Sequence, residues 1–381
     1  MWDLVVVGAG PAGSSAALAA LVASPGARVL LLDRSDFPRD KACGDGIAPH
    51  VLDLLREVGV TGLLADRVAV EHLELARSPD AVLRRMARPA WVVPRSVFDA
   101  RLVDAAVHAG ATLTRRRVRT LRRLPDRVVL DDEVEARHVV AADGAHSVLR
   151  RQLGLRTSGR IALALRGYAP TPPERRGRQV IVFGSGRQPS YAWSFDLGDG
   201  SANVGYGELL RPGRPAPQRR ELLDRLEELL PGTSQRGDSW RGHHLPLSSW
   251  RWDQPDGRVL LAGDAAHLVN PLTGEGIYYA VATGMLAGRA AITSGSGPRD
   301  AGARHRIGVR TLLGRHLQHT ALASRLVALP GIVRAGLRAA TIDQGVFDDL
   351  VEVGLGRGCL TPRVLAGIAS GFARPHHDAG W

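Results

Sequence analysis

The chain has 381 residues, of which 44% are hydrophobic and 23% are charged. At about 100–200 residues per domain, this length predicts two or three structural units with a sizeable core. No apolar run approaches the roughly 18 residues of a membrane span, and the first residues lack the basic region and cleavage site of a secretory signal. Cys43 and Cys359 are the only cysteines, so neither a disulfide framework nor a cysteine-rich metal site is expected. We therefore expect a cytoplasmic protein without a metal site.

The net charge is +12, and 49 of the 50 basic residues are arginines, the exception being Lys41. Nucleic-acid binding needs a basic stripe with interleaved aromatic residues or a known module. Only 5% of the residues are aromatic and the basic residues are spread along the chain. No nucleic-acid partner is therefore predicted, whereas contact with an anionic membrane surface or a phosphorylated substrate stays open.

The N-terminus has the pattern of a βαβ unit. An apolar run at 4–7 leads into a glycine turn, a helical stretch at 14–23 and a second apolar run that ends at Asp33. In this arrangement the glycines permit a tight turn and close approach of a pyrophosphate to the helix N-terminus, and the later acidic residue binds ribose hydroxyls. The unit predicts dinucleotide binding and leaves NAD and FAD open. Its expected contacts are Gly8, Gly10, Pro11, Ala12, Gly13, Asp33 and Arg34.

The rest of the chain divides by pattern. A helix is predicted from about Phe98 to Gly110, and apolar strands at 139–142 and 259–262. Residues 160–207 alternate apolar and polar, which predicts antiparallel strands. We expect a discontinuous nucleotide-binding domain, a β-rich substrate domain and a C-terminal helical region. Their expected limits are 1–67, 95–158 and 255–300 for the first, 68–94 and 159–254 for the second, and 301–381 for the third.

Two later segments distinguish between the dinucleotides. Residues 142–150 resemble the ADGxxSxxR signature of FAD-dependent hydroxylases, and residues 263–276 resemble the GD motif of these proteins and its flavin loop. The resemblance implies that Asp264 binds the ribityl chain of FAD and that the following helix N-terminus stabilises negative charge on reduced flavin. The cofactor contacts that it implies are Arg95, Asp143, Gly144, Gly263, Asp264, Pro271, Gly274, Gly276 and Ile277.

A further segment, residues 37–49, resembles the DKxCGDGxxP segment of the geranylgeranyl reductase family of flavoproteins. This resemblance implies an α/β fold with a Rossmann-like FAD-binding domain, an inserted and mainly antiparallel β-sheet substrate domain, and a helical C-terminus. It places Lys41, Ala42, Cys43 and Gly44 at the cofactor, and Asp45 and Gly46 at the substrate pocket. Since no second nucleotide fold is visible, we expect an external electron donor, either NAD(P)H or a reduced redox protein.

The aromatic motif of that family is altered in this chain. The family has P-x-x-Y-x-W-x-F-P, whereas here Asp196 replaces the final proline and the first proline is one residue closer. Tyr191, Trp193 and Phe195 keep their spacing, and alternate residues of a strand share one face. They are expected to line a pocket for a hydrophobic prenyl or terpenoid substrate, or to pack the domain core. Asp196 predicts a pocket of different shape or polarity.

Two side chains are candidate catalytic residues. The thiol of Cys43, two residues from Lys41, is open to a lowered pKa and to a role as proton donor. Its alternative is that of a small apolar residue packed under the flavin. Tyr191 is the second candidate. Neither has a favourable ordinary pKa for protonating an alkene.

A segment near the C-terminus leaves two structural alternatives open. Leu326, Leu329, Ile332, Val333 and Leu337 follow a roughly helical spacing, with arginines between them and Pro330 interrupting the run. The segment is either a membrane-surface helix that delivers lipid substrates or a helix packed on the body of the protein.

Three functions are compatible with these patterns. The first is an FAD-dependent reductase of carbon–carbon double bonds in a hydrophobic isoprenoid substrate, which the 37–49 segment favours. The second is an FAD-dependent monooxygenase that hydroxylates or epoxidises a terpenoid or aromatic natural product, since the FAD motifs serve it equally well. The third is a non-redox cyclase that retains FAD as a scaffold.

Overall fold

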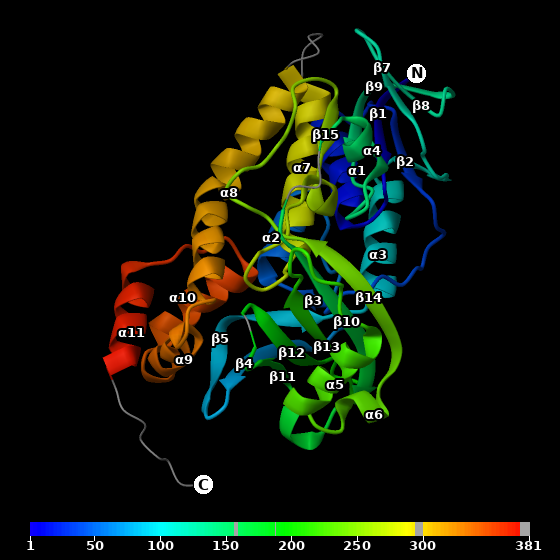
Figure 1. Cartoon of the computed structure of the whole chain (residues 1–381). Helices are drawn as coiled ribbons and strands as arrows, with labels where there is room; N and C mark the ends of the chain where they lie inside the picture. Colours follow the sequence, from blue (N-terminus) through cyan, green and yellow to red (C-terminus); the bar gives the residue numbers. More distant parts are fainter. Residues whose placement is uncertain (156–158, 187, 294–299, 374–381) are drawn as a thin grey trace.

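The computed structural model describes residues 1–155, 159–186, 188–293 and 300–373, which form two β-sheets and the helices around them (Figure 1). The smaller sheet has seven strands and the larger has eight. A helical C-terminal region lies beside the larger sheet. This is the fold class that the sequence predicts, although the exact domain limits stay a prediction.

The smaller sheet carries the predicted βαβ unit. Its parallel part runs in the order β6 (Thr112–Arg115), β2 (Val29–Asp33), β1 (Trp2–Val7), β9 (Val134–Ala141) and β15 (Val259–Leu261). Antiparallel β8 (Val128–Leu130) and β7 (Leu121–Arg123) extend it past β9. The carboxyl halves of the central strands β1 and β9 and the whole of β2 are buried, and they are mostly apolar, as expected for a parallel sheet covered by helices.

Two helices beside the smaller sheet pack so closely that their backbones are in contact. They are α1 (Pro11–Ala23) and α7 (Ile277–Thr293), which lie side by side against this sheet (Figure 1). A Cβ atom added to Gly284 would lie 2.1 Å from the carbonyl oxygen of Ala12, and one added to Gly288 would lie 2.0 Å from that of Ala16. Only glycine fits at either position, so these two residues fix the distance between the helices.

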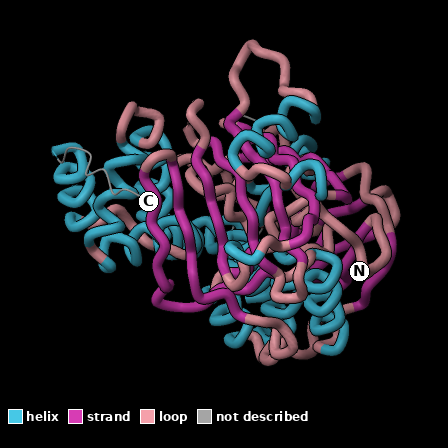
Figure 2. The backbone as a smooth tube through the Cα atoms, turned by 90° about the horizontal axis from the view of Figure 1, so that it is seen from below, coloured by secondary structure: helices cyan, strands magenta, loops and turns pink. Residues whose placement is uncertain are grey.

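The larger sheet is mainly antiparallel, as predicted for residues 160–207, and its long strands lie side by side in Figure 2. Only the β4–β11 pair is parallel. The strands follow in the spatial order β14 (Asp238–Pro246), β10 (Ile161–Pro170), β13 (Ser201–Leu209), β12 (Ser190–Asp196), β11 (Arg178–Phe183), β4 (Ala69–Arg77), β5 (Asp80–Val92) and β3 (Gly46–Ile47). Helix α5 (Arg219–Leu229) covers part of this sheet with Leu222 and Leu226.

Shorter elements connect the two sheets and position their ends. The helices α2, α3, α4 and α6 span Pro49–Glu57, Arg95–His108, Val148–Gln152 and Thr233–Arg236, and the 3₁₀ turns η1 and η2 span Pro173–Arg175 and Gly263–Ala266. The helix predicted from Phe98 is thus present and begins three residues earlier, at Arg95.

The C-terminal helices pack on the body of the protein. Helix α8 (Asp300–Leu326) contributes Val309, Leu313 and Leu317 to the core around the smaller sheet. Helices α9 (Ile332–Ile342), α10 (Gln344–Leu355) and α11 (Pro362–Ala373) lie at the end of the larger sheet.

The segment around Pro330 therefore does not form one membrane-surface helix. A turn separates α8 from α9, and Val333 and Leu337 of α9 are buried against Leu73 and Met86 of the larger sheet. The alternative of a helix packed on the body is confirmed. No helix in the described ranges is both long and apolar enough to cross a bilayer.

Candidate functional site

The glycine turn has the geometry of a phosphate-binding loop. Gly8 has a φ of +101°, and a Cβ atom there would lie 2.2 Å from the carbonyl oxygen of Ala142. A Cβ atom at Gly13 would lie 1.7 Å from the carbonyl oxygen of Gly8. Helix α1 begins directly afterwards at Pro11, and Gly10 supplies no side-chain cap. The N–H groups of the first turn therefore have no capping side chain and can bind an anion.

Asp33 is held next to this turn at the carboxyl end of β2. Its Oδ2 accepts a hydrogen bond from the backbone N–H of Ala9 at 2.8 Å, and its Oδ1 accepts one from Ser35 at 2.9 Å. The side chain is buried, and the nearest cationic group is Arg39, at 3.9 Å. This is the place expected for a carboxylate that binds ribose hydroxyls.

Lys41 and Asp264 form an ion pair between segments far apart in the chain. Lys41 Nζ lies 3.0 Å from Asp264 Oδ2, and His243 Nε2 lies 3.7 Å from the same oxygen. Although burial acts in the opposite direction, the charge of Lys41 and the His243 contact hold the pKa of Asp264 well below its usual range. Burial lowers the pKa of His243. His243 comes from β14, and no sequence pattern pointed to it.

Arg95 is fixed at the start of α3 by a buried pair. Its Nε and a terminal nitrogen donate to the two oxygens of Asp99 at 2.6 and 2.8 Å. Arg39 approaches Asp99 from the side of the turn, at 3.4 Å. The guanidinium groups of Arg39 and Arg95 thus both lie close to Gly10.

These groups surround one cavity of about 800 Å³. Most of the residues that the sequence assigned to FAD line it. They are Gly8, Gly10, Pro11, Ala12, Asp33, Arg34, Lys41, Ala42, Cys43, Gly44, Arg95, Asp143, Gly144, Asp264, Pro271, Gly274, Gly276 and Ile277. Gly13 and Gly263 do not line it, because they pack against Gly8 and against Ala12 and Ala280.

The five residues assigned to the substrate pocket, Asp45, Gly46, Tyr191, Trp193 and Phe195, also line this cavity. The three aromatic rings share one face of β12, as predicted, with neighbouring centroids 6.0 and 6.4 Å apart. The Tyr191 hydroxyl donates to the carbonyl oxygen of Thr273, which joins the wall of the larger sheet to the loop after Asp264.

Asp196 lies on the opposite face of the strand and does not line the cavity. Its carboxylate accepts hydrogen bonds from the Thr171 hydroxyl at 2.9 Å and from the backbone N–H of Gly177 at 2.6 Å. The prediction that Asp196 changes the polarity of the pocket is therefore wrong. Alternation along the strand directs this side chain away from the pocket and into the connection between β10 and β11.

Asp45 is a fully buried carboxyl group at the floor of the cavity. Its Oδ2 accepts hydrogen bonds from the Tyr168 hydroxyl at 2.6 Å and from the Asn203 amide at 2.8 Å. Asn203 in turn accepts a hydrogen bond from Trp193 Nε1 at 2.8 Å. Oδ1 of Asp45 has no hydrogen-bond partner among the described residues. Burial raises the pKa of Asp45 to about 6.

Glu275, which the sequence patterns did not assign to the site, supplies a second carboxyl group to the cavity lining. It precedes α7, and its Oε1 accepts a hydrogen bond from the backbone N–H of Tyr278 at 2.8 Å. Its Oε2 is buried and has no hydrogen-bond partner in the described part of the chain. Burial raises the pKa of Glu275 to about 8, so the group is mainly protonated at neutral pH. Its place inside the flavin-loop motif was the available signal.

The two predicted catalytic side chains have raised rather than lowered pKa values. Burial raises the pKa of the Cys43 thiol, and the opposing influences of Arg95 and Lys41 are smaller. Burial also raises the pKa of Tyr191. Of the two alternatives for Cys43, the lowered pKa is therefore contradicted, because loss of hydration outweighs the nearby positive charge.

The cavity continues beyond the aromatic wall to the C-terminal helices. Its lining there is almost entirely apolar and comes from residues that no sequence pattern assigned to the site. They are Val327, Ile332, Val333, Gly336, Leu337, Leu350, Val351, Gly354, Leu355 and Ile368.

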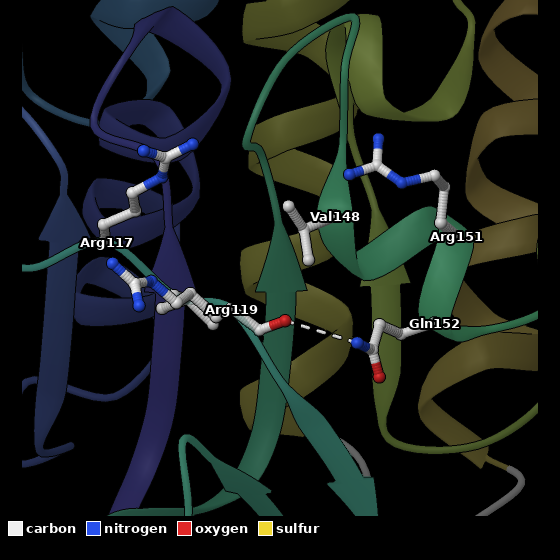
Figure 3. Close-up of a pocket in the computed structure, with 6 residues that line it drawn as sticks. Arg117, Arg119, Val148, Arg151 and Gln152 are labelled. Carbon is white, nitrogen blue, oxygen red and sulfur yellow. Dashed lines mark hydrogen bonds between the residues drawn. The ribbon is translucent and has the colours of Figure 1, made fainter.

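A separate open hollow of about 520 Å³ adjoins the nucleotide-binding unit and carries three arginines (Figure 3). Arg117 and Arg119 come from the segment after β6, and Arg151 comes from α4. Gln152 donates a hydrogen bond to the carbonyl oxygen of Arg119 at 3.2 Å, which ties the two segments together. Arg117 and Arg151 also line the large cavity.

Comparison with known proteins identifies the family. Residues 1–299 match the family model described as FAD binding domain. A protein of Mycolicibacterium smegmatis named menaquinone reductase is 35% identical over 319 residues, covering 75% of each chain. A digeranylgeranylglycerophospholipid reductase of Methanopyrus kandleri is 35% identical over 324 residues, covering 76% of this chain and 80% of that protein. The chain belongs to the geranylgeranyl reductase family. It is an FAD-dependent oxidoreductase.

Solved structures agree with this family assignment at the level of the fold. A geranylgeranyl bacteriochlorophyll reductase-like protein of Thermoplasma acidophilum superimposes with a TM-score of 0.76 at 22% identity, covering 98% of this chain and 96% of the other. The Diels-Alderase PyrE3 superimposes with a TM-score of 0.69, also at 22% identity, covering 93% and 80%. Members of the geranylgeranyl reductase family thus share their fold with enzymes of other chemistries.

Proposed function

We propose that this protein reduces a carbon–carbon double bond in the prenyl chain of a lipid or quinone. The observation that carries the proposal is the continuity of one cavity. It runs from the glycine turn and the Lys41–Asp264 pair, past the aromatic wall, to an apolar end among the C-terminal helices. A long apolar chain fits such a lining, and two relatives are named as reductases of menaquinone and of digeranylgeranylglycerophospholipid.

The residues present fit FAD. The uncapped first turn of α1 would hold the pyrophosphate, Asp33 the adenosine ribose, and Asp264 with Lys41 the ribityl chain. Arg95, held by Asp99, would lie near the same cofactor. When bound and reduced, FAD supplies a hydride to one carbon of the double bond.

The other carbon must receive a proton, and an isolated alkene accepts hydride poorly without one. Asp45 and Glu275 are our candidate acids because each lines the cavity and keeps one carboxyl oxygen without a hydrogen-bond partner among the described residues. Their pKa values of about 6 and about 8 suit proton transfer near neutral pH better than the raised pKa values of Cys43 and Tyr191 do. Cys43 and Tyr191 would then shape the pocket.

Tyr191, Trp193 and Phe195 would hold the alkene beside the cofactor. Their rings form a continuous apolar surface, and two of them are anchored through Thr273 and Asn203. Anchored rings fix the position of a flexible chain and exclude water from the reacting carbons. The chain beyond the reacting bond would extend toward α9 and α10.

We further propose that electrons come from outside the chain, either from NAD(P)H or from a reduced redox protein. The described residues contain one parallel sheet with a glycine turn, and the motifs around it fit FAD. Contact with a membrane is also part of the proposal, since prenyl lipids and quinones reside in bilayers.

Anaerobic single turnover tests the proposed reaction. The yellow protein is photoreduced without oxygen and mixed with a prenyl quinone or a polyprenyl lipid, while the flavin absorbance and the mass of the product are followed. Reoxidation with formation of a product saturated at one double bond is expected. Flavin that stays reduced until oxygen is admitted, followed by an oxygenated product, would instead establish the monooxygenase. Turnover without any change of the flavin would establish the non-redox cyclase.

A further inference from the structure

Helix α11 presents an apolar stripe on its outer side. Leu365 and Phe372 are 49% and 53% exposed, and Ile368 and Ala369 complete the spacing i, i+3, i+4, i+7 that puts residues on one helix face. The adjoining side of the helix packs on the protein. Val364 is fully buried, and a Cβ atom at Gly371 would lie 2.4 Å from the carbonyl oxygen of Ala335 in α9.

The stripe continues onto the turn between α8 and α9. A Cβ atom at Gly331 would lie 2.7 Å from the Phe372 ring, which brings the end of α11 against this turn. Leu329, two residues before Gly331, is 53% exposed, and Leu322 in the last turns of α8 is also exposed. We call the exposed side chains of Leu322, Leu329, Leu365 and Phe372 the C-terminal apolar face. In Figure 1, α11 lies at the outer edge of the molecule, next to α9 and α10.

The large cavity reaches this face. Val327, Ile332 and Ile368 line the cavity, and they lie in or beside the elements that carry the exposed side chains. Ile368 is both part of the α11 stripe and part of the cavity wall, and it is partly exposed. Ile368 therefore connects the apolar end of the cavity with the C-terminal apolar face.

The segment that contains α8 and α9 is rich in arginine. Residues 301–342 contain seven arginines and neither aspartate nor glutamate, and of these Arg306 pairs with Asp256 while Arg334 and Arg338 pair with Asp80. Arg325 is exposed between Leu322 and Leu329 and has no ion-pair partner in the part of the chain that the structure describes. Apolar side chains bordered by arginines are the composition of surfaces that insert into the headgroup region of an anionic bilayer.

We propose that the C-terminal apolar face docks on an anionic lipid bilayer and that prenyl substrates pass between α11 and the α8–α9 turn into the cavity. This proposal rests on the proposed function for its substrate, but the docking itself does not require turnover. It assigns the contact to α11 and to the turn after α8, in place of α9, whose Val333 and Leu337 are buried against the larger sheet.

Vesicle co-sedimentation tests the docking. The holoenzyme is mixed with vesicles of phosphatidylcholine alone or with a large fraction of phosphatidylglycerol, and the bound fraction is measured without substrate. Binding to the anionic vesicles is expected, with a partition coefficient that falls about tenfold for Leu365→Ser and further for Leu365→Ser with Phe372→Ser. Arg325→Gln is expected to reduce the preference for anionic vesicles about fivefold.

Leu113→Ser is the matched control, because Leu113 is also an exposed leucine, at 40%, but lies on β6 of the smaller sheet. It should bind vesicles like the unchanged protein. Thermal unfolding of each variant shows whether a loss of binding merely follows from a loss of the fold. Because Leu365 is exposed, its replacement should leave the melting temperature unchanged. Equal losses for Leu113→Ser and Leu365→Ser would overturn the proposal.

Two further measurements distinguish membrane docking from dimerisation and from a defect in catalysis. If analytical ultracentrifugation without vesicles finds a dimer that Leu365→Ser and Phe372→Ser convert to a monomer, the face is an interface between two copies and the proposal fails. Turnover of a short, water-dispersed prenyl alcohol should be the same in Leu365→Ser and the unchanged protein, whereas turnover of a vesicle-embedded substrate should fall. Reduction of the short substrate without any vesicle binding would refute docking and leave the proposed reaction standing.

Discussion

Lys41, the only lysine of the chain, places its Nζ 3.0 Å from Oδ2 of Asp264, a residue 223 positions later. The pair connects the loop after β2 with the loop before α7, and both loops line the cavity. Since the two segments meet through this contact, it fixes the relative position of two walls of the cavity.

Replacing Lys41 by methionine is expected to lower the free energy of unfolding by about 1–3 kcal/mol, since it leaves a mostly buried carboxylate with only His243 nearby. The lowered pKa of Asp264 gives the sign of the pH effect. The carboxylate of Asp264 contributes fully to the free energy of unfolding above its pKa in the unfolded chain, about 4, and this contribution is lost as the pH falls below that value. Urea unfolding of the unchanged protein and the variant at pH 7 and pH 3.5 measures both the loss of stability and its pH dependence. Lys41→Arg should keep most of the stability, and an equal loss in both variants would show that the ion pair is not its cause.

The carboxyl group of Asp45 is expected to make the protein less stable as pH rises from about 4 to 6. Its pKa is raised to about 6, so in this range the folded state holds a proton that the unfolded chain has released. The loss approaches about 3 kcal/mol and is complete above pH 6. Asp45→Asn removes the titrating group, keeps an acceptor for Tyr168, and should reduce this dependence. Unfolding by urea at pH 4.5 and pH 7.5 checks it; an unchanged pH dependence in the variant would contradict the assignment.

Glu275 is expected to impose a pH limit on the reaction. If its protonated form supplies the proton, the rate should fall as pH rises through about 8, the pKa of the group. Glu275→Gln should slow reoxidation of the reduced flavin by the alkene about 100-fold and abolish the limit near pH 8. Anaerobic stopped-flow measurement from pH 6 to 9 records both effects. If Asp45→Asn abolishes the rate and Glu275→Gln leaves the profile intact, Asp45 is the proton donor.

Gly336 on α9 offers a way to shorten the cavity. It lines the cavity, and a Cβ atom there would have no neighbour within 4 Å. Gly336→Leu is expected to lower kcat/KM for a long prenyl substrate about tenfold, because the leucine occupies space for the chain end, while a short prenyl substrate is unaffected. The helix itself should gain up to about 1 kcal/mol. Gly314→Leu on α8 is the control, because a Cβ atom there also has no neighbour within 4 Å, and it should leave kcat/KM for both substrates unchanged.

The sequence predicts those parts of the site that depend on local spacing. Gly8, Gly13 and Asp33 belong to one βαβ unit, so their relation follows from the strand and helix between them. The shared face of Tyr191 and Trp193 follows from strand alternation. Alternation also places Asp196 on the other face. A residue that departs from a family motif can therefore be interpreted only when the face to which its side chain points is known.

Contacts between distant segments were not predictable in the same way. His243 reaches Asp264, and Asn203 reaches Asp45, only because the larger sheet positions β14 and β13 beside loops of the other unit. No local pattern fixes that register. The alternative of a lowered pKa for the Cys43 thiol is contradicted for a related reason, since the burial of the thiol depends on the whole assembly and outweighs the charge of a sequence neighbour.

The backbone contact of α1 with α7 at Gly284 and Gly288 limits the substitutions that these two helices can accept. A single methyl group at either glycine would collide with α1, and the displacement would reach the cofactor end of both helices. The helices α9 and α11 have a comparable contact between Gly371 and Ala335, but Gly336 of α9 has open space around it and lines the far end of the same cavity. Directed evolution toward substrates of other chain lengths should therefore find its accepted substitutions at open positions of the cavity wall such as Gly336, while the glycines between packed helices remain as they are.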